Sequence, residues 1–423
     1  MIRSTRARRA AVALAATALV LTACGSEDDD SDNTADDTES SAPAAAKGDG
    51  VLNIGMLLPQ TGDLAYLGPP EFAGVELAIQ EINEAGGVNG KPVKSSRADS
   101  GDGTPDIAGA SVDSLLGDGV DTIIGAAASG VSLSVIDKIT GAGVVQFSPA
   151  NTAAAFDTYD DKGLYFRTAP SDRLQGQVLA NMAVEDGFSN VAVVARQDAY
   201  GEGLAEQVVE TLEEQGATVA ADILYAADAQ NFTAEVNELA AAKPDAIVLV
   251  AFNETTKIIP QLISKGLGPQ DVQLYFVDGN MADYSSEKFD LTGVKGTFPA
   301  PAEVDEEFNN KLKSIDKGLK DFTYGPQSYD ATMLTALAAI AAGDDSGEAI
   351  ASEIVNVSKD GEACSTFADC VELLEAGEDI NYEGVSGPSD LNDSGSPSAA
   401  TIGIQEYKGN KYSQIDSVSG VLD

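Results

Sequence analysis

The chain has 423 residues and carries 68 acidic against 25 basic side chains, a formal net charge of −43. A chain this acidic repels phosphate backbones, so we expect no nucleic-acid partner. It contains no histidine, which excludes serine–histidine and cysteine–histidine catalytic pairs, histidine metal ligands and the usual general base. We therefore expect a protein that is not an enzyme and has no catalytic residue, no bound metal and no cofactor.

The first residues have the pattern of an export signal. Four arginines lie within residues 1–9, and an uncharged, mostly apolar run at 10–23 follows, too short to span a bilayer. It ends in the sequence LTAC at 21–24, which resembles the bacterial lipoprotein signal. We predict that residues 1–23 are a lipoprotein signal peptide and that Cys24 is lipidated. An uncleaved anchor or an ordinary secretory signal is the alternative.

An acidic segment follows the predicted lipid anchor. Residues 26–50 contain nine acidic residues, one lysine and no large apolar side chain. Such a segment cannot bury a core, so we predict that residues 24–50 are the lipidated cysteine and a disordered tether. The alternative, an acidic calcium-binding array, lacks the ligand spacing and glycine of a calcium loop. The protein would then lie on the extracytoplasmic face of the cell membrane, held only by its lipid.

The body begins with alternating strands and helices. Phe72, Val75, Ile79 and Ile82 fall on one face of a helix, which Gly86 and Gly87 end. The remaining elements of this first half are predicted as strands at 51–58, 91–98, 121–125 and 144–147, and helices at 106–116 and 131–140. This alternation predicts an α/β fold with a parallel sheet.

A second half has the same alternation without a residue-level repeat. Its predicted elements are helices at 174–185, about 204–214, 232–242 and 256–264, and strands at 191–195, 219–225, 245–252 and 272–277. After Lys295 the alternation changes: we expect helices around 303–317, 328–342 and 347–357, and two final strands at 401–407 and 411–418. These last strands could return to either sheet.

Two cysteines remain once Cys24 is lipidated. Cys364 and Cys370 lie six residues apart, and in an exported protein we predict a disulfide between them. Two buried free thiols are the alternative. The spacing does not match the CxxC of a redox motif.

Polar residues follow several of the predicted strands. In an open parallel sheet, ligands bind beyond the carboxyl ends of the strands. Ser129 and Thr152 come after two strands of the first half and before predicted helices, where free backbone N–H groups favour an anion such as a carboxylate. Asp278 follows the last strand of the second half and can oppose an ammonium group. The set is complementary to an amino-acid zwitterion, with Tyr66, Tyr200 and Phe252 as candidate walls for its side chain.

Each of these residues also has an ordinary structural interpretation. Serine and threonine at helix starts are usually N-caps, and Asp278 precedes a glycine in a common turn sequence. Tyr200 and Phe252 could be packing residues. The hypothesis depends on independent candidates reaching the same sheet edge.

Five segments resemble one known family: IGMLLPQTGDLAYLGPPEFAGVELAIQEINEAGGVNGKPV, VDTIIGAAASG, VVQFSPANTAA, AYGEGLAEQV and LYFVDGN. They are similar to the leucine/isoleucine/valine-binding proteins, which are type I periplasmic solute-binding proteins of ABC transporters. The resemblance implies two Rossmann-like lobes joined by three crossover segments. Lobe 1 would comprise residues 51–170 and about 299–398, and lobe 2 residues 171–298 and about 399–423.

The resemblance also implies roles for single residues. Ser129 and Thr152 would hold the ligand carboxylate, and the carbonyl of Ala150 would share the ammonium with Asp278. Tyr200 and Tyr66 match ligand-site tyrosines. The sequence departs from the family pattern at three places. The family often has Glu at the position of Asp278 and Tyr at the position of Phe252. The first loop is one residue longer than in the family, which could displace Tyr66 by Leu67.

The expected function is therefore binding with hinge closure. The partners would be a small-molecule ligand, most simply a branched-chain or other apolar amino acid, and an ABC permease with its ATPase. We expect a monomer. The alternatives are a receptor for an amide, urea, a short peptide or an aromatic acid, and a sensor that feeds a signalling partner.

Overall fold

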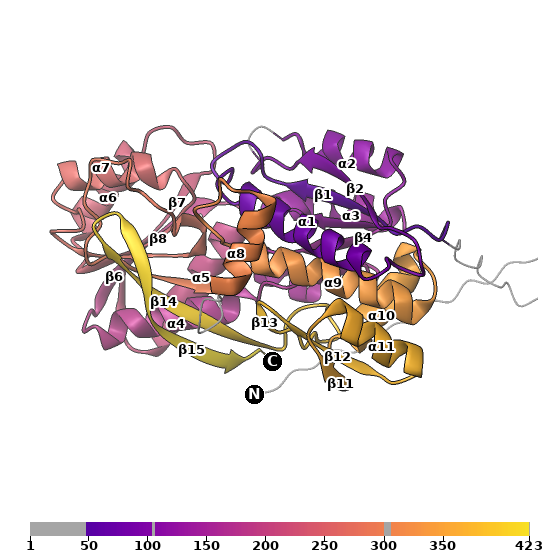
Figure 1. Ribbon diagram of the computed structural model, residues 1–423. Helices are drawn as coiled ribbons and strands as arrows, with labels where there is room; N and C mark the ends of the chain where they lie inside the picture. The colour runs from indigo at the N-terminus through magenta and orange to yellow at the C-terminus, as the bar shows by residue number, and fades with distance from the viewer. Residues whose placement is uncertain (1–47, 104–105, 300–305, 423) are drawn as a thin grey trace, which may run out of the picture. The chain divides into compact units, whose positions relative to one another are not determined.

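The computed structural model describes residues 48–103, 106–299 and 306–422 (Figure 1). The predicted signal peptide, the lipidation of Cys24 and nearly all of the predicted tether lie outside these residues and stay predictions. Among the residues described, no helix is both long enough and apolar enough to cross a membrane.

The first half of the body forms a sheet of five parallel strands. Their order across the sheet is β2-β1-β3-β4-β5, and every neighbouring pair is parallel. The strands are β1 (Asn53–Leu58), β2 (Lys94–Asp99), β3 (Thr122–Gly125), β4 (Val145–Ser148) and β5 (Tyr165–Arg167). The prediction of a parallel sheet is confirmed here. The three-residue β5 was not predicted, because so short a run has no readable period.

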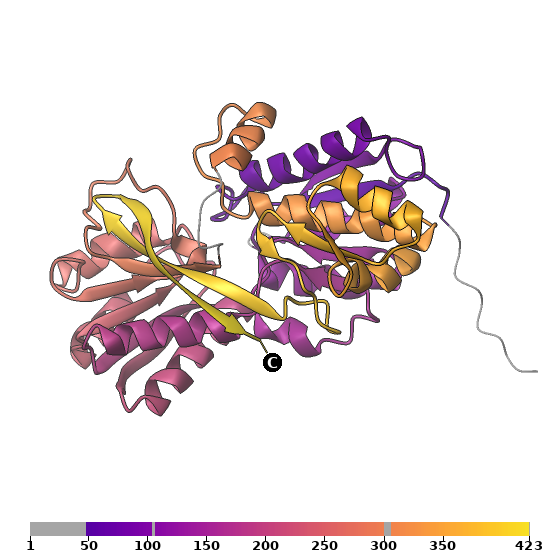
Figure 2. The same cartoon turned by 60° about the horizontal axis from the view of Figure 1, so that its bottom comes forward.

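The second sheet has seven strands in the order β15-β14-β10-β9-β8-β6-β7. Strands β6 to β10 are parallel, whereas β14 pairs antiparallel with β10 and with β15, so the two C-terminal strands return to this sheet (Figure 2). The strands are β6 (Asn190–Gln197), β7 (Thr218–Ala226), β8 (Ala246–Val250), β9 (Gln273–Phe276), β10 (Lys295–Pro299), β14 (Ala399–Lys408) and β15 (Lys411–Val421). Glycine and proline within β10 hid it from sequence analysis.

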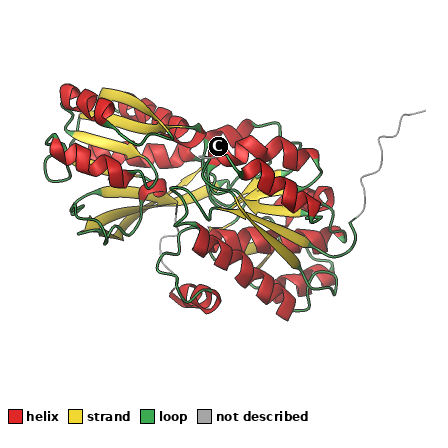
Figure 3. Ribbon diagram, turned by 90° about the horizontal axis from the view of Figure 1, so that it is seen from above, coloured by secondary structure: helices red, strands yellow, loops and turns green. Residues whose placement is uncertain are grey.

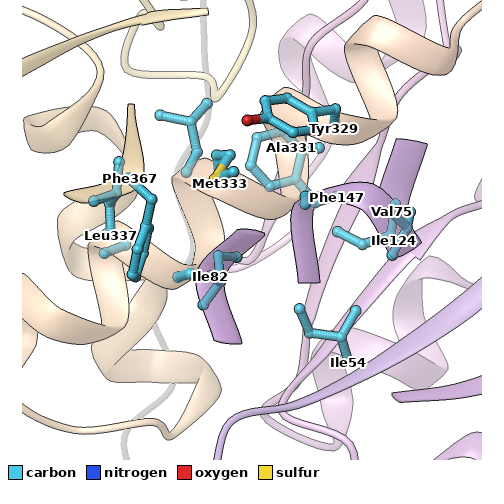
Figure 4. Packing of buried hydrophobic residues seen from close by; sticks show 14 of the residues in the cluster. Ile54, Val75, Ile82, Ile124, Phe147, Tyr329, Ala331, Met333, Leu337 and Phe367 are labelled. Carbon is cyan, nitrogen blue, oxygen red and sulfur yellow. The ribbon is translucent and has the colours of Figure 1, made fainter. Parts of the chain in front are cut away.

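Helices flank the strands of both large sheets (Figure 3). They are α1 (Gly68–Glu84), α2 (Ala108–Gly117), α3 (Ser129–Gly141), α4 (Asp172–Glu185), α5 (Ala199–Glu214), α6 (Thr233–Ala242), α7 (Thr255–Ser264), α8 (Glu306–Ile315), α9 (Gly325–Ala342), α10 (Gly347–Val357) and α11 (Phe367–Ala376). Helix α9 is buried on almost every side, including its polar residues, and packs against α1 and α10. Its residues Ala331, Met333 and Leu337 belong to the same buried cluster as Ile54 and Phe147 of the first sheet (Figure 4).

A second buried cluster joins the two large sheets. Leu57 and Ile123 of the first sheet belong to it together with Val193 and Val248 of the second. The apolar contact is therefore continuous from one sheet to the other, and it brings the carboxyl ends of their strands close together. The mixed α/β architecture, with one parallel sheet and one sheet that is parallel from β7 to β10, agrees with the predicted fold class.

A small third sheet contains Cys364, and the helix α11 contains Cys370. The sheet consists of β11 (Glu362–Cys364), β12 (Ile380–Gly384) and β13 (Gly387–Pro388), which sequence analysis did not predict, and α11 lies between β11 and β12. The sulfurs of Cys364 and Cys370 are bonded to each other. The buried Asp330 of α9 holds this sheet in place, because its carboxylate accepts hydrogen bonds from the hydroxyl of Tyr382 and the backbone N–H of Ser386.

Candidate functional site

The loop after β3 makes a sharp turn that depends on a glycine. Gly125 has a φ of 127°, and a Cβ there would lie 1.9 Å from the carbonyl oxygen of Leu57 on β1. Only glycine permits this close approach. The chain then runs through three alanines to Ser129, the first residue of α3. The turn therefore places Ser129 at the carboxyl edge of the first sheet.

Side chains tie this loop to the loop after β4. The Ser148 hydroxyl donates to the carbonyl of Ala126 at 2.7 Å and accepts from the N–H of Ala150 and Asn151. The Asn151 amide donates to the carbonyls of Ala126 and Ala127 at 3.0 and 2.7 Å. All these groups are buried, so the pair of loops is fixed by hydrogen bonds formed largely within a 25-residue stretch.

Ser129 and Thr152 lie together, but not as helix caps. The Ser129 hydroxyl does not cap its own helix; it accepts a hydrogen bond from the N–H of Ala153 at 3.3 Å. Thr152 precedes only a five-residue 3-10 helix, η1 (Ala154–Thr158), so the prediction of an ordinary helix start there was wrong. The proline and asparagine around Ala150 shape a turn instead. The buried Thr152 hydroxyl has no hydrogen-bond partner among the described residues.

Asp278 occupies the facing edge of the second sheet. It follows β9 and opens a short 3-10 helix, η2 (Asp278–Asn280), and its side chain is 4% exposed. Its carboxylate accepts from the hydroxyls of Tyr200 and Tyr324, at 2.6 and 2.7 Å, and from the Gln175 amide at 2.9 Å. Burial, followed by the charge of Asp278, raises the pKa of both tyrosines, so they remain neutral donors.

Asp278 has no positively charged neighbour that neutralises it. None of the ion pairs among the described residues includes it. A buried carboxylate held only by neutral donors retains strong affinity for a cation.

Two aromatic rings stand beside Asp278. The rings of Tyr200 and Phe252 are stacked with centroids 5.5 Å apart. Behind them, the Arg196 guanidinium lies 3.5 Å from the centre of the Phe252 ring and pairs with the buried Glu254 at 2.8 Å. The cation–π contact fixes the orientation of Phe252 from its rear face.

Tyr66 lies next to the cavity but not in its lining. Its hydroxyl donates to the carbonyl of Gly279 at 3.1 Å, which links the first loop to the turn after β9. Leu64 and Leu67 line the cavity in its place.

The cavity between the two edges has a volume of about 20 Å³. Five of the seven predicted ligand residues line it, and Thr152 and Tyr66 do not. Its lining consists of Leu64, Leu67, Ala127, Ala128, Ser129, Ala150, Tyr200, Phe252, Asp278, Gly279 and Tyr324. This space is the size of a single water molecule, so a larger solute requires the two edges to separate. Two larger cavities, of about 480 and 510 Å³, contain none of the seven predicted residues.

Sequence analysis missed three polar residues at this site. Tyr324 comes from the loop before α9 with a left-handed φ of 58°, and nothing local in the sequence marks it. Gln175 and Asp172 lie three residues apart on α4, and this spacing on one helix face was the only available signal. Burial raises the pKa of Asp172 well above its usual range, and the charge of Asp278 raises it further.

Asp99, at the end of β2, has a structural role. The Asp99 carboxylate accepts from the hydroxyl of Thr61 and the N–H of Gln60 and Gly101. Within the described part of the chain, no group of three or more cysteine, aspartate or glutamate side chains is arranged to hold a metal ion.

Comparison with known proteins gives consistent matches. The family model described as periplasmic binding protein matches residues 51–398. A chemotactic signal transduction substrate-binding protein, BasB, of Halobacterium salinarum is 25% identical over 80% of this chain and 83% of its own length. Leu/Ile/Val-binding protein homolog 1 of Brucella abortus is 30% identical over 70% of this chain and 80% of its own length.

The fold also matches a solved structure. A leucine binding protein, LivK, of Thermotoga maritima superposes with a TM-score of 0.72 at 21% identity, covering 87% of this chain and 99% of that one. The relatives with printed functions are solute-binding proteins and not enzymes. With its two parallel sheets, its facing strand ends and a family match over most of its length, the chain belongs to the periplasmic binding protein family.

Proposed function

We propose that this protein is the solute receptor of an ABC importer and that it binds an α-amino acid, branched-chain or otherwise apolar, between Ser129 and Asp278. Asp278 is the single observation that carries this proposal. It is a buried carboxylate with three neutral donors and no basic partner among the described residues. A ligand ammonium supplies the missing charge in a dry site, where such a pair is strong.

The opposite edge suits the carboxylate of the same ligand. The first turn of α3 begins at Ser129 and presents N–H groups that have no partner within the helix. The unpaired hydroxyl of Thr152 adds a further donor. The carbonyl of Ala150, also at the cavity, is available to the ammonium. The two ends of a zwitterion thus meet groups of opposite character.

The remaining walls favour an apolar side chain. Leu64 and Leu67 come from the first loop, and Phe252 is held by Arg196 from behind. Burying one apolar side chain against such walls contributes about 2 kcal/mol. These walls supply no hydrogen-bond donor for a polar side chain, which supports an apolar amino acid over a polar one.

Hydrogen bonds across the two edges suit a closing motion. The Tyr66 hydroxyl reaches Gly279, and the Tyr324 hydroxyl reaches Asp278. Both bonds connect the second-sheet turn to segments that pack with the first sheet, so both must break when the edges separate. A ligand that bridges the edges would favour the closed form by its extra contacts there.

A thermal-shift panel tests the proposal. The twenty common amino acids, urea, acetamide, benzoate and short peptides are compared, and we expect the largest rise in Tm with an apolar amino acid. Calorimetry then measures the affinity of that ligand. A panel in which benzoate or an amide raises Tm and no amino acid does would contradict the proposal.

We also propose that Cys24 carries a lipid that anchors the protein on the extracytoplasmic face of the cell membrane, as a monomer that delivers its ligand to an ABC permease and ATPase. The sequence LTAC after a short apolar run supports this, and so does membership of a periplasmic family. Replacing Cys24 by serine should release the protein from the membrane fraction. Retention of the C24S protein would contradict the lipid anchor.

The second candidate function is a sensor role. The similarity to a substrate-binding protein of a chemotactic system favours it. Deleting the gene distinguishes the two roles. If the protein is the receptor of an importer, the deletion abolishes uptake of labelled ligand. If it is a sensor, the deletion leaves uptake intact and removes the cell's response to the ligand.

A further inference from the structure

We propose that the cavity of about 480 Å³ is a second binding site, which takes an uncharged, largely apolar molecule with one hydrogen-bond donor, such as an aromatic alcohol, and whose occupancy favours the closed form of the protein. A volume of this size falls in the usual range of small-molecule sites. The cavity contains none of the seven residues predicted for the amino-acid ligand. The site therefore goes beyond the proposed function, and its existence does not depend on that function.

The cavity lies where the chain passes between the two large sheets. The chain leaves the first sheet after β5, leaves the second sheet after β10 and enters the second sheet again at β14. Each of these three passages contributes one buried proline to the cavity wall: Pro170, Pro299 and Pro397. Because proline has a fixed φ, each of these wall segments is stiff. A movement of one sheet relative to the other therefore changes the distances between the three walls.

The remaining walls belong to elements of both large sheets. Gln327 comes from α9, the helix that packs with the first sheet, whereas Ala400 begins β14 and Gly420 lies near the end of β15. A molecule in the cavity contacts segments that must shift when the sheets separate. Its affinity should consequently differ between the open and the closed form, which is the condition for coupling to the closing motion.

The lining selects an uncharged molecule. None of the described residues around this cavity has a charged side chain, although 22% of the residues in the chain are charged. An ion in the cavity would lose hydration without meeting a counter-ion. The apolar part of the lining comes mainly from Pro170, Pro299, Pro388, Leu391 and Pro397.

The polar atoms at this cavity favour a hydrogen-bond donor. Gln327 is 4% exposed; its Nε2 donates to the carbonyl of Pro299 at 3.4 Å, and its Oε1 accepts no hydrogen bond from the described residues. The hydroxyls of Thr168 and Ser386 already donate, to the carbonyl of Gln327 and the carboxylate of Asp330. These groups leave free lone pairs, and the buried Oε1 without a partner is the acceptor that a ligand hydroxyl would satisfy.

Calorimetry with four probes of similar size tests the site. Benzyl alcohol, benzyl methyl ether, benzoate and benzylammonium are titrated into protein saturated with its tightest amino acid, so that the ligand site is already filled. We expect benzyl alcohol to bind about tenfold more tightly than the ether, which lacks the donor, and more tightly still than either ion. If no amino acid binds, the same titrations use the protein alone.

Two variants connect the binding to this cavity. Ala400→Phe fills part of the space and should weaken benzyl alcohol at least about tenfold, whereas Ala241→Phe, exposed on α6, should change nothing. Gln327→Met keeps the size of the side chain and removes the acceptor, so the alcohol and the ether should bind equally. Tm is measured for each variant, and Gln327→Met decides the question if Ala400→Phe does not fold.

The coupling is tested by linkage. Saturating benzyl alcohol should tighten the amino acid about threefold, and the amino acid should tighten benzyl alcohol by the same factor. Unchanged affinities would overturn the coupling. Absence of benzyl alcohol binding, or binding that neither folded variant alters, would overturn the site. A protein that binds benzyl alcohol in this manner but binds no amino acid would contradict the proposed function and support the second site.

Discussion

The two edges of the candidate site are built in different ways. On the first sheet, Ser148 and Asn151 fix the loops around Ser129 through bonds to backbone groups of the same two loops, at most 25 positions apart in the sequence. On the second sheet, Asp278 is held by Tyr200, Tyr324 and Gln175, which come from three separate segments. The first edge is thus a local, uncharged construction, and the second is a charged one assembled by distant side chains.

This difference assigns different tasks to the two edges. Backbone groups fixed by local bonds form a rigid receptor for one end of a ligand, and they lose little entropy on binding. A carboxylate surrounded by side chains from elsewhere responds to the relative position of the two sheets. We expect changes at the second edge to alter mainly affinity, and changes at the first edge to alter stability as well.

The largest effect should follow from Asp278→Asn. Because it removes the charge that pairs with the ammonium, we expect affinity for the amino acid to fall about 100-fold, or about 3 kcal/mol. Calorimetry measures the effect, and Asp271→Asn, exposed before β9, is the matched control. If Asp278→Asn binds the amino acid as tightly as the control variant does, Asp278 does not belong to the ligand site.

Ser148→Ala should have the next largest effect. It leaves the buried N–H groups of Ala150 and Asn151 without their acceptor, so we expect a loss of about 2 kcal/mol in the free energy of unfolding and a weaker ligand affinity. Urea denaturation measures the stability, and the exposed Ser134→Ala on α3 serves as control. Unchanged stability would show that the first edge does not depend on this hydroxyl.

Tyr324→Phe should weaken binding about tenfold with little change in stability. The variant keeps the ring against Phe298 and removes one donor to Asp278. Tyr159→Phe, whose hydroxyl bonds to Asp137 away from the cavity, provides the comparison. A large fall in Tm for the Tyr324 variant would mean that the hydroxyl stabilises the fold and does not serve to orient the Asp278 carboxylate for a ligand.

The smallest effect concerns an acid outside both edges. The pKa of Asp121 is raised to about 7, mainly by burial. The N–H of Asn53, which bonds to the carboxylate, lowers the pKa, and the charges of Asp345, Asp49 and Asp344 raise it. Between its usual value and pH 7, the folded protein binds a proton that the unfolded chain does not. This contribution is therefore fully present below the usual pKa of the carboxyl group, is lost progressively as the pH rises, and is gone above a pH of about 7.

Asp121→Asn should consequently raise Tm by a few degrees at pH 8 and by a smaller amount at pH 5, with ligand affinity the same at both. Differential scanning calorimetry at the two pH values measures this. Equal Tm changes at pH 5 and pH 8 would show that the protonation of Asp121 is not linked to folding.

Sequence analysis predicted the features of this fold and site that depend on local sequence, and it missed those that depend on residues distant in the chain. Strand and helix alternation was readable because apolar periodicity is local. Ser129 was predicted from its place after a strand and Ala150 from the family resemblance, and both line the cavity. Tyr324, Gln175 and Asp172 reach the site through tertiary packing, which no local pattern encodes. Thr152 was found, but the turn at Ala150 and Asn151 replaced the expected helix start.

The shorter elements were missed for a related reason. Strands β5 and β11 have three residues each, and β10 contains glycine and proline, so their pairing is decided by neighbours and not by their own sequence. In the first loop, Leu64 and Leu67 line the cavity and Tyr66 does not, because tertiary packing decides which side chains of an irregular loop face inward.

A crystal structure of the protein with its tightest amino acid bound tests the account most directly. We predict that the ligand nitrogen lies about 3 Å from the Asp278 carboxylate and the ligand carboxylate lies at the start of α3, near Ser129. A ligand bound in the reverse orientation, or in one of the two larger cavities, would contradict it.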